Sequence, residues 1–157
     1  MISMTKPKIF ILSGPIQSGK TSRLFKWCEG RNDVSGILTP DLQGKRYFMD
    51  ITTKELFLME AGENEENILS IGKYKFSKSA FELASQILSH AINKNSGWII
   101  VDEVGPLELK GEGFSEVIKK LFLIPSDLNI ILVVRENLFD TVLQYFNIKE
   151  YSLFSEL

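Results

Sequence analysis

Three short, continuous apolar runs stand out from the pattern of hydrophobic and polar positions along the chain. They cover residues 9–12, 98–101 and 130–134, are rich in β-branched side chains and have polar or turn-forming residues around them. Runs of this length are typical of strands buried on both faces, as in parallel sheets covered by helices. We therefore expect these three segments to form the centre of a parallel sheet.

Amphipathic segments lie between and after these runs. Residues 81–91, 114–122 and 138–146 each repeat apolar side chains at the spacing of one helical face. The expected helix boundaries are a capping box of Ser79 with Glu82, an N-cap at Asn137 and the helix-breaking Pro125. Because strands alternate with helices, the sequence predicts an α/β fold in which a mostly parallel sheet is flanked by helices.

One region departs from this alternation. Residues 36–40 and 45–51 read as two strands around a Gln43-Gly44 turn, which predicts an added antiparallel hairpin that either extends the sheet or flanks it. Residues 60–67 are acidic and are expected to form a solvated loop. The chain has neither an internal repeat nor a linker, so we expect a single domain over residues 1–157.

Composition narrows the range of functions. Hydrophobic residues make up 44% of the chain and the net charge is −2, which supports a sizeable core and favours neither nucleic acid nor an anionic membrane as a partner. Cys28 is the only cysteine and His90 the only histidine, which excludes an internal disulfide and argues against a zinc site. The apolar run at residues 9–12 is too short for a signal sequence, so we expect a cytoplasmic protein.

The strongest chemical signal follows the first apolar run. Residues 14–21 match G-x-x-x-x-G-K-[ST] at every fixed position, and a random chain of this composition matches it about once in a hundred. In such a loop the backbone N–H groups point at phosphate oxygens, Lys20 reaches the β- and γ-phosphates and Thr21 offers its hydroxyl to Mg²⁺. The residues expected to bind a nucleotide here are Gly14, Pro15, Ile16, Gln17, Ser18, Gly19, Lys20, Thr21 and Ser22.

Two carboxylates follow the second apolar run. In a phosphate-loop protein the first acid at a strand end holds Mg²⁺ through its water shell, which is the role expected for Asp102. Glu103 follows directly, so its side chain points to the other side of the strand, where it can orient an attacking water or accept its proton. We therefore expect Thr21 and Asp102 to bind the metal and Glu103 to act as the general base. The alternative is that both acids are solvated charges at a strand end.

Together these motifs resemble one family. Residues 14–21, 36–51, 72–82 and 101–109 come in the same order and spacing as in the thermophile-type nucleoside-triphosphatases, also called cancer-related nucleoside-triphosphatases in animals. The resemblance covers most of the chain and implies a RecA-like phosphate-loop fold and Mg²⁺-dependent hydrolysis of nucleoside triphosphates, ATP and GTP among them, to diphosphates. Besides the loop, it implies nucleotide binding at Ile99, Ile100, Val101, Asp102, Glu103, Val104, Gly105 and Pro106.

The arginines depart from the family's pattern. In the hairpin Asp41 lacks the arginine that usually follows it, although residues 44–46 keep the family's Gly-x-Arg, and the last third of the chain lacks the family's Asn-Arg element. Arg135 follows the third apolar run and lies beside the Asp102 strand if the strand order is RecA-like. It is therefore either a catalytic group at the γ-phosphate or a solvated charge.

Three further residues have two interpretations each. Arg46 either reaches phosphate from the hairpin or flanks its turn, with the turn flank the more common arrangement. Glu108 either supports the site or lies at the surface. Trp27 either stacks on a base or, more commonly for such a residue, packs on the hairpin.

The residues leave two other classes of function open. One is a small-molecule kinase, which needs a lid with several arginines, whereas this chain has four arginines and no cluster of them. The other is a non-catalytic nucleotide-binding module, which would be favoured if Glu103 pointed away from the nucleotide. A GTPase is disfavoured because the chain has no Asn-Lys-x-Asp motif for guanine.

Overall fold

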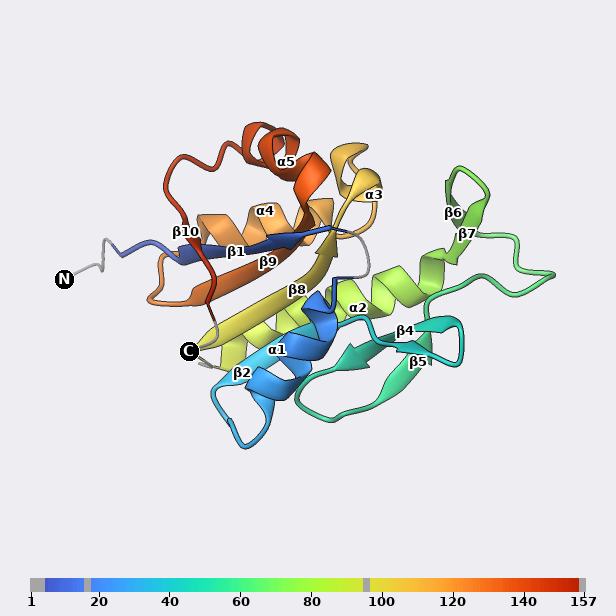
Figure 1. Ribbon diagram of the computed structural model, residues 1–157, viewed down its shortest axis with the longest axis horizontal. Coiled ribbons are helices and arrows are strands. Elements are labelled where there is room, and N and C mark those ends of the chain that lie inside the picture. The colour runs from blue at the N-terminus through green and yellow to red at the C-terminus, as the bar shows by residue number, and fades with distance from the viewer. Residues whose placement is uncertain (1–4, 16–17, 95–96, 156–157) are drawn as a thin grey trace.

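One sheet of eight strands runs through the part of the molecule that the computed structural model describes, residues 5–15, 18–94 and 97–155 (Figure 1). Its strands are β1 (Lys8–Gly14), β2 (Val34–Leu38), β3 (Asp41–Leu42), β4 (Lys45–Asp50), β5 (Leu56–Leu58), β8 (Trp98–Val104), β9 (Asn129–Arg135) and β10 (Ser152–Leu153). The strand order is β10-β1-β9-β8-β2-β4-β3, and β5 pairs with β4.

The strands from β10 to β2 are parallel, which confirms the sheet predicted from the three apolar runs. β1 and β8 are not neighbours, because β9 lies between them and pairs with both. This is the RecA-like order that the family resemblance implied. It brings the carboxyl ends of β1, β9 and β8 to one edge of the sheet, where Gly14 lies opposite Arg135. Ligands of open α/β sheets bind outside such an edge.

The predicted hairpin forms and extends the sheet. β4 pairs antiparallel with β2 and β3, and the turn before it has positive φ at Gln43 and Gly44, as tight hairpin turns require. Because β4 runs antiparallel to β2, its first residues, including Arg46, lie beyond the carboxyl end of β2. A second hairpin, of β6 (Ile68–Ile71) and β7 (Tyr74–Ser77), was not predicted.

Close contact between β2 and β8 depends on one glycine. Gly36 has a φ of +114°, and a Cβ at this position would collide with the backbone carbonyl oxygen of Ile100. The two strands therefore approach as closely as they do only because residue 36 has no side chain. This pairing sets the position of everything that follows β2, including the hairpin.

Helices cover both faces of the sheet, but unequally. They are α1 (Lys20–Cys28), α2 (Lys78–Ala91), α3 (Pro106–Leu109), α4 (Ser115–Leu123) and α5 (Phe139–Tyr145), with 3₁₀ turns at Ile92–Lys94 and Glu136–Leu138. Buried side chains of α2, α4 and α5 share a core cluster with alternate residues of β8 and β9. On the opposite face Leu24 and Cys28 of α1 pack with Ile100 and Ile131 (Figure 1). Within the described residues, no helix has the length and apolar character that crossing a membrane requires.

The sequence predicted these helices better than their ends. Ser77, and not Ser79, caps α2, because its hydroxyl accepts a hydrogen bond from the Ala80 N–H at 3.2 Å. Asn137 lies inside the 3₁₀ turn before α5 and does not cap that helix. Pro125 lies just beyond the end of α4, as expected.

An aromatic cluster lies between α1 and the sheet, at the first residue of β8. Trp27 meets Trp98 and Phe154 edge-on with ring centroids 5.2 Å apart in both cases, and the Arg31 guanidinium lies 3.9 Å above the Trp27 ring. Trp27 also packs against the core cluster that contains Met49 and Ile51 of the hairpin region, and the chain that returns after α5 adds Phe154 beside β1. These contacts also disfavour the alternative that Trp27 stacks on a base.

Candidate active site

The phosphate loop joins the central strand β1 to α1. Gly19 is the N-cap of α1 and has a φ of 81°, a left-handed conformation that glycine adopts without strain. α1 begins at Lys20, so the free N–H groups of its first turn face the space beyond the carboxyl end of β1. Ser22 lies in that turn and is exposed, whereas Ile16 and Gln17 fall outside the described residues.

Lys20 is folded into the loop. The residue is only 6% exposed, and its Nζ donates to the carbonyl oxygens of Pro15 at 2.7 Å and Gly14 at 3.1 Å and to the Ser18 hydroxyl at 3.4 Å. A Cβ at Gly14 would lie 2.9 Å from that hydroxyl, so a larger residue there would have to displace the Ser18 side chain. The loop therefore holds an ammonium group in place before any anion binds.

Asp102 is buried beneath the start of α1. It is 1% exposed, and its Oδ2 accepts hydrogen bonds from the Thr21 hydroxyl at 2.7 Å and from the Thr39 N–H at 3.1 Å. Burial raises the pKa of Asp102, and the hydrogen bond from Thr21 opposes this shift. Thr39 was not predicted as part of the site. The available signal was its position directly after β2, the strand that neighbours β8.

The adjacent carboxylate faces two arginines. Oε1 of Glu103 lies 3.4 Å from Nη2 of Arg135, at the end of β9, and 3.8 Å from Nη2 of Arg46, in β4. These side chains are 18% exposed for Glu103, 27% for Arg135 and 35% for Arg46. The two neighbouring acids therefore have different surroundings, one in the interior against neutral donors and the other near the surface against guanidinium groups.

Glu108 is buried, so the alternative that it is a surface charge is wrong. It is 3% exposed, and its two carboxylate oxygens accept hydrogen bonds from the N–H groups of Gly105 at 2.7 Å and Phe114 at 2.9 Å. Burial raises the pKa of Glu108 to about 7. Glu108 ties the chain just after β8 to the start of α4, which makes it a support for the strand end that carries the two acids.

The other residues of the predicted nucleotide-binding segment have supporting positions. Apolar side chains of β8 lie in the two core clusters, so they hold Asp102 in place and do not face a ligand. Gly105 is buried after the strand, and Pro106 begins α3. The buried apolar residues are Ile99, Ile100, Val101 and Val104. The structure thus brings together the phosphate loop, Asp102, Glu103 and Arg135 at one edge of the sheet.

The donor set at this edge fits Mg²⁺ better than a softer metal. Within the described residues, no group of three or more His, Cys, Asp and Glu side chains could hold a metal ion. The hydroxyl of Thr21 and the carboxylate of Asp102 are hard oxygen donors in direct contact. Mg²⁺ is usually bound by one or two carboxylates together with substrate phosphates, so these two residues fit the ion once a nucleotide supplies phosphate oxygens.

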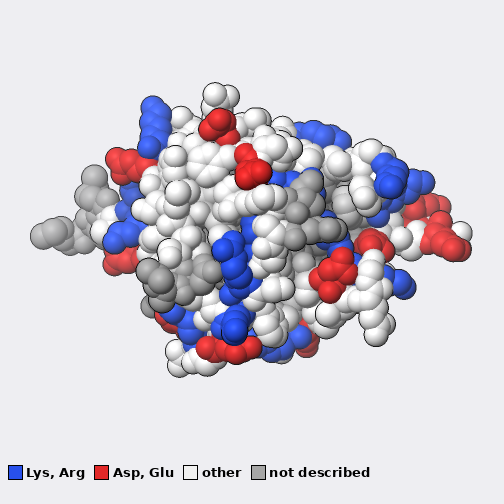
Figure 2. All heavy atoms as spheres, in the orientation of Figure 1, with Lys and Arg blue, Asp and Glu red and all other residues white. Residues whose placement is uncertain are grey.

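Charges of both signs are interspersed on the face of the molecule in Figure 2. Acidic side chains gather there over the loop between β5 and β6, which contains Glu60, Glu63, Glu65 and Glu66. In Figure 1 this loop lies at the right of the view, beyond β4 and β5. On this face of the molecule, Lys and Arg side chains therefore form no broad basic surface.

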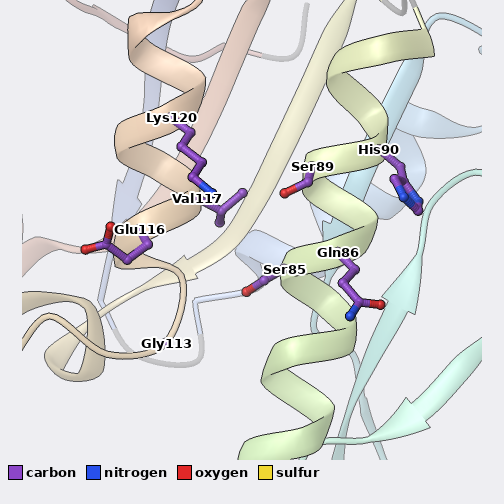
Figure 3. Close-up of a pocket in the computed structure, with 8 residues that line it drawn as sticks. All are labelled: Ser85, Gln86, Ser89, His90, Gly113, Glu116, Val117 and Lys120. Carbon is purple, nitrogen blue, oxygen red and sulfur yellow. The ribbon is translucent and has the colours of Figure 1, made fainter.

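A shallow groove of about 220 Å³ lies between α2 and α4. Ser85, Ser89, Val117 and Lys120 point into the gap, whereas Gln86, His90 and Glu116 point away from it (Figure 3). The groove shares no residue with the phosphate loop or with the carboxyl ends of β8 and β9. It is therefore separate from the candidate active site.

The sheet is RecA-like, its strand β1 leads into a phosphate loop, and the acidic end of β8 is separated from β1 by a single strand, β9. These features define a phosphate-loop nucleotide-binding protein. Residues 9–155 match the family model described as NTPase, and the chain belongs to this NTPase family.

Relatives and solved structures agree with this assignment. The chain is 29% identical over 141 residues to a nucleoside-triphosphatase THEP1 of Methanocaldococcus jannaschii, covering 83% of this chain and 79% of the relative. It is 29% identical over 142 residues to that of Methanothermobacter thermautotrophicus, covering 84% and 79%. The fold is similar to a crystal structure of THEP1 from Aquifex aeolicus (TM-score 0.71, 18% identity, 94% and 88% of the two chains). It is also similar to a solution structure of a human cancer-related nucleoside triphosphatase (TM-score 0.66, 18% identity, 95% and 90%).

Proposed function

We propose that this chain, acting as a single domain, hydrolyses nucleoside triphosphates such as ATP and GTP to diphosphates and phosphate with the help of Mg²⁺. The observation that carries the proposal is that the two neighbouring carboxylates at the end of β8 have different contacts. Asp102 contacts Thr21 of the phosphate loop, and Glu103 faces the opposite side at the same sheet edge. One acid is thus available for a metal and the other for water.

In this mechanism the loop binds the triphosphate. Lys20 would exchange its carbonyl partners, Gly14 and Pro15, for the β- and γ-phosphate oxygens, since a charged phosphate is the stronger acceptor. The N–H groups of the loop and of the first turn of α1 would hold the remaining phosphate oxygens. Thr21 and Asp102 would hold Mg²⁺, which neutralises phosphate charge when bound.

Glu103 is the proposed general base. A water beside the γ-phosphate would give its proton to the Glu103 carboxylate while its oxygen bonds to phosphorus and the bond to the β-phosphate oxygen breaks. Arg135 lies between Glu103 and the end of β1, opposite Gly14, which supports a role at the charge that develops on the phosphate. Transition-state stabilisation by arginine accounts for large rate factors in this chemistry.

The two alternative functions have less support. A kinase acceptor site needs groups that exclude water from the transferred phosphate, whereas the Glu103 side chain at this edge is partly exposed. A non-catalytic module has no need for a second acid that faces cationic groups at the same edge. The relatives are also named nucleoside-triphosphatases.

The test is the substitution Glu103→Gln. It keeps the size and the hydrogen-bonding oxygen of the side chain but cannot take a proton, so hydrolysis should fall by roughly 10²–10⁴-fold while ATP still binds. Phosphate release and calorimetric ATP binding are measured on the same preparation, with Glu66→Gln in the exposed loop as a matched control. Phosphate release at the wild-type rate from Glu103→Gln would refute the general-base role.

A further inference from the structure

Two arginines from opposite flanks of β8 converge on one carboxylate oxygen. Arg135 comes from β9 on one side, and Arg46 comes from the hairpin on the other side, beyond β2. Both guanidinium groups approach Oε1 of Glu103, at 3.4 and 3.8 Å. The hairpin therefore contributes a cationic group to the edge of the parallel sheet, although Arg46 lies far from the phosphate loop in the sequence.

The charge at this point is unbalanced. Among these three side chains one carboxylate faces two guanidinium groups, which leaves an excess of one positive charge within the group. Partly exposed ion pairs of this kind contribute little to folding stability, so the cluster is poorly explained as a structural feature. A guanidinium group presents a rigid fork of N–H donors that matches phosphate oxygens, and a terminal phosphate carries more negative charge than a carboxylate.

We propose that Arg46 is a further catalytic residue and that Arg46 and Arg135 move from Glu103 to the terminal phosphate when a triphosphate binds. This inference rests on the proposed function. Glu103 holds both arginines near the site beforehand, and their transfer frees its Oε1 to face the attacking water. A diphosphate lacks the terminal group, so it leaves the arginines on Glu103.

The transfer gives the hairpin a function. Arg46 is held by the pairing of β4 with β3 and β2, and its carbonyl oxygen accepts a hydrogen bond from Met59 N–H at 3.0 Å. Its backbone is therefore fixed while its side chain remains 35% exposed. A long side chain on a fixed strand can exchange one oxygen partner for another without moving the backbone.

The test compares Arg46→Ala with Lys45→Ala, the exposed neighbour in the same strand. Steady-state ATP hydrolysis is measured, together with binding of ADP and of the non-hydrolysable β,γ-imido analogue of ATP. We expect kcat to fall roughly 10²–10³-fold in Arg46→Ala, with ADP affinity within about twofold of wild type and a reduced preference for the triphosphate analogue. Lys45→Ala should match wild type in all three measurements.

Arg46→Lys provides the second variant. It keeps the charge but loses the planar fork, so it should recover only part of the lost rate. Equal melting temperatures of the variants and wild type, followed by circular dichroism, show that the fold persists. If wild type hydrolyses ATP and Arg46→Ala has the same kcat, the inference is overturned and the proposed function stays intact.

The binding measurements separate the two proposals. If wild type releases no phosphate, the proposed function fails, and the preference for the triphosphate analogue over ADP then decides the role of Arg46. Loss of that preference in Arg46→Ala supports contact with the terminal phosphate. A preference equal to that of wild type contradicts it.

Discussion

The two sides of the candidate site are built in different ways. On the loop side, formed by Lys20, Thr21 and Asp102, Lys20 and Asp102 are almost wholly buried and the shortest contacts are 2.7 Å. On the arginine side, formed by Arg46, Glu103 and Arg135, every group is partly exposed and the N–O distances are 3.4 and 3.8 Å. Buried hydrogen-bonded groups are costly to separate unless a stronger acceptor replaces the lost partner, whereas exposed ion pairs exchange partners at little cost.

This difference suggests how the work is divided. The loop side has its geometry before the nucleotide arrives, so it is suited to binding phosphates in a fixed position. The arginine side can rearrange, so it is suited to responding to the terminal phosphate. Changes on the loop side should therefore alter mainly the affinity for the nucleotide, and changes on the arginine side should alter mainly turnover.

Both sides depend on the pairing of β2 with β8, and Gly36→Ala should break them together. A Cβ at Gly36 collides with the Ile100 backbone, and the φ of +114° is unfavourable for alanine. We expect a loss of roughly 3–5 kcal/mol in the free energy of unfolding, measured in urea. Gly44→Ala is the control, because Gly44 also has a positive φ but has open space around its Cα. Its loss should be about 1 kcal/mol, and equal losses in the two variants would contradict the packing argument.

The parallel part of the sheet was the easiest feature to predict from the sequence. Each of its central strands is buried on both faces, so its residues had to form a continuous apolar run. The phosphate loop and Asp102 could also be predicted from the sequence, because each lies at the end of such a strand. The loop side of the site therefore follows from local patterns.

The arginine side could not be predicted in the same way. Arg46 reaches Glu103 only because β4 folds back beside β2, and no spacing in the sequence records that contact. Glu108 is one acid among apolar residues, and only the N–H groups of Gly105 and Phe114 explain its burial. Trp27 meets Phe154 from the far end of the chain. These features depend on tertiary contacts, which periodicity does not encode.

Beneath the arginine side, Glu108 should make stability depend on pH. Its pKa is raised from 4.5 to about 7, chiefly by burial. A carboxyl group with a raised pKa in the folded state stabilises the fold fully below its unfolded pKa and loses this contribution as pH rises through the folded pKa. Between pH 5 and pH 8, wild type should therefore lose roughly 2–3 kcal/mol from this group.

Glu108→Gln tests this expectation, because the amide does not ionise. Its free energy of unfolding should change less than that of wild type between pH 5 and pH 8, measured by urea titration at each pH. Glu116→Gln is the control, since the Glu116 side chain is 78% exposed. It should keep the wild-type slope. A wild-type slope in Glu108→Gln would show that other groups cause the pH dependence.

On the loop side, Lys20→Ala should reduce affinity more than stability. The loop keeps its N–H groups but loses its ammonium, and a hydrogen bond to a charged group is worth about 1.5–3 kcal/mol, or roughly a 10–150-fold weaker binding of ATP. The carbonyl oxygens of Gly14 and Pro15 become accessible to water, so the melting temperature should change little. Calorimetric ATP binding equal to wild type would remove Lys20 from the site.

Asp102→Asn should give the smallest effect and the clearest separation of the two sides. The amide oxygen can still accept the hydrogen bonds from Thr21 and Thr39, so the fold should persist, and without Mg²⁺ the loss of a buried charge should leave stability equal or higher. The missing charge should raise the Mg²⁺ concentration for half-maximal turnover by about tenfold, because carboxylate charge contributes to affinity for the ion. Turnover at saturating Mg²⁺ should fall much less, since Glu103 and its arginines are untouched.

Asp127→Asn, at an exposed position, serves as the control in a titration of phosphate release against Mg²⁺. An unchanged Mg²⁺ requirement in Asp102→Asn would mean that this acid only supports the fold, and the contrast between the two sides would then have to be explained without a metal on the loop side.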